Sequence, residues 1–236
     1  MDIQQLIEID KSLLLTLNGF HSLFLDGFMW TVTSTLIWIP AILVLLFVIF
    51  KNNKTYDSLF ILLMIGLTIL FADQFASSFC KPFFCRLRPA QDPDIMSLVH
   101  VVNGYRGGMY GFISSHAANT FGVAVFVSLL IRKWGVSLLM ISWAFVPSYS
   151  RIYLGVHYPG DILFGALAGI IIAVINYSIY LFVKNKMMKG HTVRYASSSY
   201  SNSYGPSDLK LLYLILILTY IFAVINGMII SKLLHF

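Results

Sequence analysis

Three cationic side chains, Lys81, Arg88 and Arg151, stand close to the ends of long apolar runs. A charge at the centre of a bilayer costs about 2.5–3.5 kcal/mol, so a chain with only 11% charged residues is expected to use the charges it places there. Arginine binds phosphate oxygens through two parallel hydrogen bonds, and lysine adds a point charge. The three cations therefore predict a site for a phosphate group.

A second segment, Ser114-Ser115-His116, lies at the start of an apolar run and is expected at the N-terminus of a helix. Free backbone N–H groups and the helix dipole favour an anion there, and the Ser114 hydroxyl would add a donor. Capping the helix is the other use of Ser114, but it leaves His116 unexplained. Snorkelling to the membrane surface explains a lysine or an arginine near a span end, but not histidines and an aspartate in the same places.

The third segment contains His157 and Asp161, with Pro159 between them. Proline suits the first turn of a helix, so a helix is expected to begin there. Asp161 then lies in the first turn and can reach back to His157. A carboxylate on one ring nitrogen fixes the tautomer and leaves the other nitrogen free to attack an electrophile. This pair predicts a nucleophilic histidine.

These segments resemble the three motifs of the type 2 phosphatidic acid phosphatase superfamily of membrane lipid phosphatases, KxxxxxxRP, PSGH and SRxxxxxHxxxD. Lys81–Pro89 fits the first motif in full, and Ser150–Asp161 fits the third in full. The second motif is represented by Ile113–His116, which keeps the serine and the histidine but lacks the proline and the glycine. The region that carries the motifs covers roughly residues 58–183.

The resemblance implies a role for each matching residue. His157 corresponds to the nucleophile that takes the phosphoryl group, Asp161 to its orienting partner, and His116 to the general acid that protonates the leaving oxygen. The residues implied to bind the substrate phosphate are Lys81, Arg88, Ser114, Ser115 and Arg151. The resemblance implies no metal or other cofactor, and the sequence offers no carboxylate pair that would hold one. Cys80 and Cys85 have no histidine at zinc spacing, and their spacing leaves open whether they form a disulfide.

The resemblance also implies an enzyme that hydrolyses a lipid phosphate or lipid diphosphate. The leading candidates are undecaprenyl diphosphate and a phosphate of lipid A, with phosphatidylglycerophosphate and phosphatidate as alternatives, and the site residues do not choose among them. A transporter using the same charges, a different class, predicts polar residues near the midplane and broken spans. In this sequence the polar residues lie at the ends of the expected spans instead. No nucleic acid or protein partner is expected besides the lipid substrate and the bilayer.

The elements that must position these residues follow from composition. The chain is 58% apolar, against about 45–50% in soluble domains, which excludes disorder, a fibrous protein and an ordinary soluble enzyme. It predicts an all-α polytopic membrane bundle in one domain, residues 1–236, with a linker at 184–210. Each apolar run is near the ~20 residues needed to cross a bilayer, the fourth marginally. The six expected spans are Phe28–Phe50, Ser58–Cys80, 112–131, 134–149, Ile162–Val183 and Leu211–Ser231.

The expected orientation follows from the N-terminal segment and the loop charges. Residues 1–18 carry an apolar stripe at helical spacing, which predicts an amphipathic helix lying in the membrane interface. Lys and Arg number nine in the connections 51–54, 132–133 and 184–210, and seven elsewhere, three of which belong to the predicted site. The positive-inside rule then places these connections in the cytoplasm. The predicted active site faces the periplasmic or outer side of a bacterial-type inner membrane.

Overall fold

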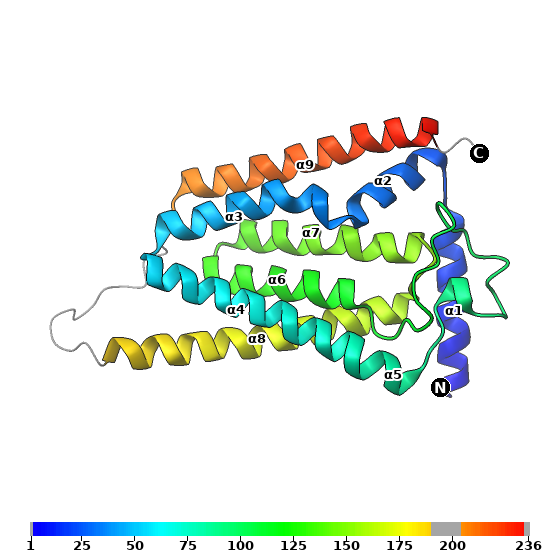
Figure 1. The fold of residues 1–236 in the computed structure, drawn as a ribbon, viewed down its shortest axis with the longest axis horizontal. Coiled ribbons are helices and arrows are strands. Elements are labelled where there is room, and N and C mark those ends of the chain that lie inside the picture. The colour runs from blue at the N-terminus through cyan, green and yellow to red at the C-terminus, as the bar shows by residue number, and fades with distance from the viewer. Residues whose placement is uncertain (1, 190–203, 234–236) are drawn as a thin grey trace.

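The computed structural model describes residues 2–189 and 204–233, and within these ranges the regular structure is helical. The α-helices are α1 Ile3–Gly19, α2 Leu23–Thr33, α3 Ile39–Asn52, α4 Thr55–Gln74, α5 Lys81–Phe84, α6 Ser115–Ile131, α7 Trp134–Tyr153, α8 Pro159–Lys189 and α9 Pro206–Leu233. The axes of the long helices are roughly parallel to one another, whereas α1 lies across one end of the bundle (Figure 1). The expected all-α bundle is confirmed for the described residues.

Membrane-crossing helices are identified by their length and apolar composition. Four stretches of the described chain meet both conditions, Thr35–Asn52, Thr55–Phe84, Pro159–Lys186 and Pro206–Lys232. α6 is apolar but has 17 residues, and α7 has 20 residues but is not among these four. Each of the six apolar runs thus contains helix, and four helical stretches have the length and composition of a membrane span.

The first apolar run, expected as one span over Phe28–Phe50, is broken. α2 ends at Thr33, Ser34 is extended with φ −74° and ψ 132°, and a 3-10 turn over Thr35–Trp38 leads into α3. The hydroxyl residues at the break are weak helix formers, because their side chains compete for backbone hydrogen bonds. Trp38 donates its indole N–H to the carbonyl of Val32, 3.1 Å away, so the break leaves this buried carbonyl satisfied.

The second span runs past its expected end at Cys80. α4 is followed by a π-helical segment over Phe75–Cys80 and then by α5, which ends at Phe84. Pro82 lacks an N–H and interrupts the regular hydrogen-bond pattern, and π segments are often found at functional sites. Cys80 is buried and Cys85 is exposed, and both are free thiols.

The last three helices are longer than their apolar runs. α7 continues to Tyr153, so Arg151 lies on its last turn rather than in a connection. α8 begins at Pro159, as expected, and extends to Lys189, and α9 begins at Pro206. Polar residues therefore continue these helices beyond the apolar core. The segment between α8 and α9, residues 190–205, is shorter than the expected linker 184–210. Most of that linker, residues 190–203, lies outside the described residues.

α6 and α8 pack closely and place two predicted motifs side by side. A Cβ added at Gly165 or Gly169 of α8 would collide with the backbone of Ser114 or Ala118. Small residues let helix backbones approach in membranes, where packing drives association. The contact brings the N-terminus of α6 next to that of α8, and the backbone N–H of Ser114 donates to the carbonyl of Asp161, 3.0 Å away.

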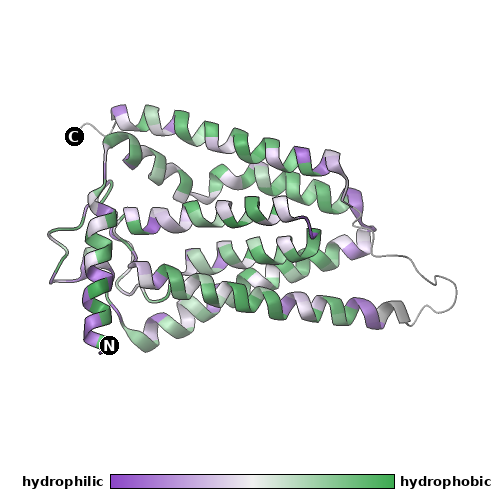
Figure 2. Ribbon diagram, turned by 180° about the vertical axis from the view of Figure 1, so that it is seen from behind, coloured by the Kyte–Doolittle hydropathy of each residue, from purple (hydrophilic) through white to green (hydrophobic). Residues whose placement is uncertain are grey.

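The outer surface of the bundle is strongly apolar. Large side chains on different helices are more than half exposed, including Phe47, Leu63, Ile171 and Phe222. Hydrophilic residues are most frequent near the ends of the bundle and on α1 (Figure 2). An apolar belt with polar ends is the surface that a bilayer solvates, so the described helices form a membrane bundle.

Candidate active site

The predicted site residues meet at the end of the bundle that α1 crosses. They come from α5 and the segment that follows it, the start of α6, the end of α7, the connection between α7 and α8, and the start of α8. The pKa of His157 is lowered by burial and by the charges of four nearby residues, Lys81, Arg88, Arg151 and His116. Segments up to 80 residues apart in the sequence therefore build one polar centre.

His157 and Asp161 form the expected pair. His157 Nδ1 lies 3.2 Å from Asp161 Oδ2, and the same oxygen accepts the backbone N–H of Tyr158 at 3.1 Å. A carboxylate only accepts, so Nδ1 carries the hydrogen and Nε2 keeps a free lone pair. Burial, and then the positive charges of Arg88 and Arg151, lower the pKa of His157 well below its ordinary value. His157 is therefore neutral at physiological pH, which is the nucleophilic form.

Arg88 and Arg151 offer unused hydrogen-bond donors. Arg88 Nε donates to the carbonyl of Tyr110 at 3.1 Å, whereas its Nη1 is buried without a partner. Arg151 donates to Thr33 Oγ1 at 2.7 Å and to the Tyr105 hydroxyl at 3.2 Å, whereas its Nε is buried without a partner. Buried N–H groups are nearly always paired, so these two fit a ligand with acceptor oxygens, such as phosphate.

The loop before α6 approaches Arg88 through glycine. Gly107 has φ +66°, and a Cβ there would lie 2.6 Å from Arg88 Nη1. Glycine is therefore required both by the left-handed backbone and by the space. The unpaired Nη1 therefore lies close to the Gly107 backbone, where no side chain could fit.

Lys81 and the serines form the next wall of the site. Lys81 Nζ donates to Ser77 Oγ and to Ser115 Oγ, each at 3.3 Å. The hydroxyl at position 115, where the second motif has glycine, thus accepts a hydrogen bond from the lysine. Ser114 is the N-cap of α6 and accepts the N–H of Ala117 at 3.3 Å. Its capping role is observed, and its hydroxyl hydrogen remains available to a ligand.

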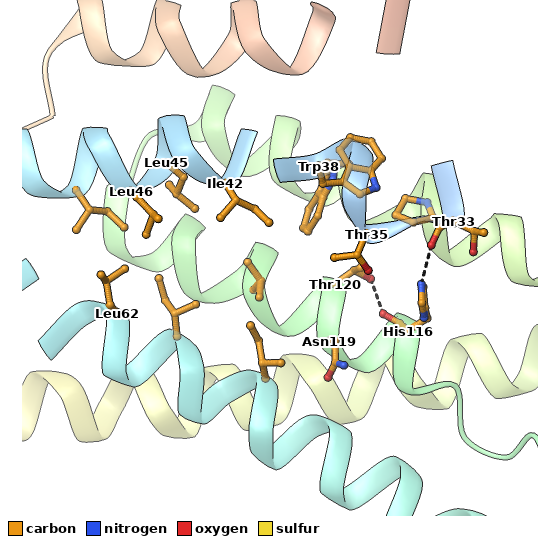
Figure 3. Close-up of a pocket in the computed structure, with 16 residues that line it drawn as sticks. Thr33, Thr35, Trp38, Ile42, Leu45, Leu46, Leu62, His116, Asn119 and Thr120 are labelled. Carbon is orange, nitrogen blue, oxygen red and sulfur yellow. Dashed lines mark hydrogen bonds between the residues drawn. The ribbon is translucent and has the colours of Figure 1, made fainter. Parts of the chain in front are cut away.

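His116 contacts the broken first span. Its Nε2 lies 3.2 Å from the backbone oxygen of Thr33 (Figure 3). A carbonyl oxygen only accepts, so Nε2 carries a hydrogen and Nδ1 is the nitrogen left for proton exchange. Thr33 thereby holds His116 through its carbonyl and Arg151 through its hydroxyl.

Several residues at this site were not predicted from the sequence. They are Thr33, Tyr105, Arg86 and Asp10. Arg86 donates Nη1 to Asp161 Oδ1 at 3.1 Å and Nη2 to Asp10 Oδ2 at 2.8 Å. Arg86 could have been suspected because it lies inside the first motif, and Thr33 because it opens a run of hydroxyl residues within an apolar segment. Asp10 carries no such signal.

An apolar cavity of about 320 Å³ adjoins His116. Ile42, Leu45 and Leu46 of α3 face Leu62 of α4 across it, and α6 and α7 complete its walls (Figure 3). His116 and Thr33, which belong to the polar centre described above, are among its lining residues. The cavity therefore connects an apolar interior to the polar site.

Comparison with known proteins gives consistent matches. The sequence profile of the PAP2 superfamily matches residues 58–185. A lipid A 4'-phosphatase of Bacteroides thetaiotaomicron is 47% identical over 168 residues, covering 71% of this chain and 75% of that protein. A lipid A 4'-phosphatase of Porphyromonas gingivalis is 36% identical over 206 residues, covering 84% of each chain. The crystal structure of Aquifex aeolicus LpxE superposes with a TM-score of 0.53 at 26% identity, covering 71% of this chain and 93% of that chain.

Proposed function

We propose that this chain, which belongs to the PAP2 superfamily and is a membrane lipid phosphate phosphatase, removes the 4'-phosphate of lipid A through a phosphohistidine intermediate. The observation that carries the mechanism is the pair of unpartnered buried N–H groups, Arg88 Nη1 and Arg151 Nε, beside a neutral His157. A phosphate bound by these groups would present its phosphorus to the free Nε2 of His157.

The first chemical step transfers the phosphoryl group to the enzyme. His157 Nε2 attacks phosphorus, the bond from phosphorus to the lipid oxygen breaks, and Asp161 stabilises the charge that forms on the ring. When the phosphate dianion binds and offsets the nearby cations, His116 takes up a proton on Nδ1 while Nε2–H stays on the Thr33 carbonyl, and it gives the Nδ1 proton to the leaving oxygen. Lys81, Arg88 and Arg151 stabilise the negative charge of the five-coordinate phosphorus.

The second step regenerates the enzyme. Neutral His116 accepts a proton from water at Nδ1, the water oxygen bonds to phosphorus, and the bond from phosphorus to His157 Nε2 breaks. Inorganic phosphate is released, and His116 is again protonated for the next turnover. All protons and leaving groups are accounted for by the two histidines, the lipid and one water.

The apolar cavity supports a lipid as the substrate. His116 stands between the cavity and the phosphate site, so the leaving oxygen of a lipid whose acyl chain enters the cavity would lie beside the proposed acid. A phosphatase site also explains why the first span is broken, although broken spans are found in transporters as well. The backbone oxygen and hydroxyl freed at the break bind His116 and Arg151, so the break serves the phosphate site.

The choice of lipid A over other lipid phosphates rests on the relatives. Both lipid A 4'-phosphatases align with more than two thirds of this chain. The three cations would bind the phosphate of undecaprenyl diphosphate, phosphatidylglycerophosphate or phosphatidate by the same chemistry, so these remain the competing substrates.

The proposed topology has six spans, α1 in the membrane interface, and the active site on the periplasmic side. At ~1.5 Å per residue, the 17 residues of α6 reach about 26 Å, close to the ~30 Å hydrocarbon core. α7 reaches about 30 Å with its 20 residues. The loop charges support the orientation, and α1 lies across the end of the bundle that holds the site.

Phosphate release by the purified protein tests the proposal. Lipid A, undecaprenyl diphosphate, phosphatidylglycerophosphate and phosphatidate would be compared in matched detergent micelles, with His157→Ala as the control. We expect the highest kcat/KM for lipid A, loss of its 4'-phosphate by mass spectrometry, and no release by His157→Ala. A higher kcat/KM for another lipid would overturn the substrate assignment, and full activity of His157→Ala would overturn the mechanism.

A further inference from the structure

Asp10 of α1 reaches into the active-site end of the bundle. Its Oδ1 accepts the backbone N–H of Gly160 at 2.8 Å, and its Oδ2 accepts Arg86 Nη2 at 2.8 Å. The Asp10 side chain is 15% exposed and that of Arg86 is 23% exposed. One carboxylate from the N-terminal helix therefore accepts hydrogen bonds from both the first turn of α8 and an arginine within the first motif.

Arg86 also contacts Asp161, so it links Asp10 to the carboxylate that pairs with His157. Its Nη1 donates to Asp161 Oδ1 at 3.1 Å, and its guanidinium lies 4.0 Å from the ring centre of Tyr158. Asp161 is fully buried, and its other oxygen, Oδ2, holds His157 Nδ1. The two oxygens of Asp161 are thus divided between Arg86 and the histidine, so a shift of Arg86 would rotate the carboxylate and the imidazole with it.

We propose that Asp10 and Arg86 are positioning residues that orient Asp161, and through it the attacking ring of His157. The inference rests on the proposed function, in which His157 is the nucleophile. α1 is then part of the active site, although it carries none of the three motifs. A planar guanidinium with a carboxylate at each of two nitrogens has little freedom to turn, which is the property that a positioning group needs.

The glycine at position 160 fits this role. A Cβ there would lie 2.6 Å from Asp10 Oδ2, so any larger residue would push the Asp10 carboxylate away from the start of α8. Gly160→Ala therefore offers a test that leaves every charge in place. Alanine is a good helix former, so the start of α8 itself should tolerate the change.

A simpler role for the ion pair is to dock α1. Partly exposed ion pairs contribute ~0–1 kcal/mol, and α1 has another such contact one residue away. Lys11 Nζ lies 2.7 Å from Asp94 Oδ2 and 3.5 Å from Asp92 Oδ2. Lys11→Gln removes this neighbouring ion pair of the same helix without touching Arg86, so it is the matched control.

The experiment compares Asp10→Asn, Gly160→Ala, Arg86→Gln, Arg86→Lys and Lys11→Gln in the full chain, in micelles. Steady-state kinetics would be joined to rapid-quench detection of phosphohistidine. We expect kcat to fall about 10-fold in Asp10→Asn and Gly160→Ala and about 100-fold in Arg86→Gln, since small misplacements of reacting groups cost this much. KM and the vanadate inhibition constant should stay within about twofold, because the phosphate-binding cations do not contact Asp10.

Three further results are expected. Phosphohistidine formation should slow in proportion to kcat, Arg86→Lys should recover part of the loss, and Lys11→Gln should match the unmodified protein. The double variant Asp10→Asn/Arg86→Gln should be no slower than Arg86→Gln, because residues that act through one contact are not additive.

Equal losses in Asp10→Asn and Lys11→Gln would overturn the inference and leave α1 docking as the role of Asp10. Additive losses in the double variant, or losses carried by KM and vanadate binding, would overturn it as well. Unchanged vanadate inhibition shows that each variant is folded at the site. If Asp10→Asn is fully active while His157→Ala is inactive, only this inference is wrong. If His157→Ala is active, the proposed function on which the inference rests is wrong.

Discussion

The hydroxyl of Thr33 lies 2.7 Å from Arg151 Nη1, although 118 positions separate the two residues. The contact exists because the first apolar segment breaks directly after Thr33. A continuous helix would have used the Thr33 carbonyl for its own hydrogen bonds, whereas the break frees it for His116. One residue of the broken span thus contacts both a proposed phosphate-binding cation and the proposed acid.

Removing only the Thr33 hydroxyl should weaken phosphate binding. Thr33→Val keeps the shape and the backbone carbonyl but removes the acceptor for Arg151. A hydrogen bond to a charged group contributes about 1.5–3 kcal/mol, so we expect the vanadate inhibition constant to rise about 10-fold or more. Thr33→Ser is the control and should bind vanadate normally. Equal inhibition of both variants would show that Arg151 is positioned by other contacts.

The two histidines should fail differently. His157→Ala removes the nucleophile and should form no phosphohistidine. His116→Ala should lose about 10²–10⁴-fold with a lipid substrate, because a general acid contributes that much. The loss should be smaller with nitrophenyl phosphate, whose oxygen leaves without a proton. Rapid-quench assays of both variants decide the roles, and equal losses of His116→Ala on both substrates would contradict the acid assignment.

The pH dependence should reflect the environment of His157. Burial and Arg88 lower the pKa of His157, so the neutral, nucleophilic form persists as the pH falls through 6.5. The acid limb of kcat/KM that belongs to His157 should therefore lie below the ordinary pKa of a histidine, 6.5. Arg88→Gln removes one of the charges that lower this pKa, so its acid limb should move to higher pH. Substrate ionisation, titrated separately, is common to both proteins, and an unmoved limb would count against this account.

Vanadate should inhibit the enzyme, and chelators should not. The clamp of Lys81, Arg88 and Arg151 suits a five-coordinate oxyanion. Activity measured with vanadate and, separately, after incubation with EDTA checks both expectations. Loss of activity in EDTA that a divalent ion restores would require a metal in the mechanism.

The orientation of the bundle is open to a labelling test. Leu98, in the loop at the site end, is 68% exposed, and Thr55 at the opposite end is also exposed. In a background that carries Cys85→Ser, Leu98→Cys should react with a membrane-impermeant reagent added to intact spheroplasts. Thr55→Cys should react only after the membrane is opened. The reverse pattern would place the active site in the cytoplasm.

The sequence determined the features that depend on near neighbours. Apolar runs predicted the membrane helices, Pro159 marked the start of α8, and Ser114 marked that of α6. The four-residue spacing of His157 and Asp161 predicted their contact. Caps, prolines and helical periodicity act within a few residues, so the chain itself displays them.

Only the tertiary structure decided which distant groups complete the site. Asp10 reaches Gly160 across 150 positions, and Thr33 reaches Arg151 across 118. Arg86 lies inside the first motif and Arg106 in the loop that follows, but the sequence does not show that Arg86 contacts Asp161 while Arg106 donates to the carbonyl of Ala90. The break at Ser34 and the crossing of α1 set these contacts. Both depend on how the helices pack against each other, and this packing cannot be read from the local pattern of residues.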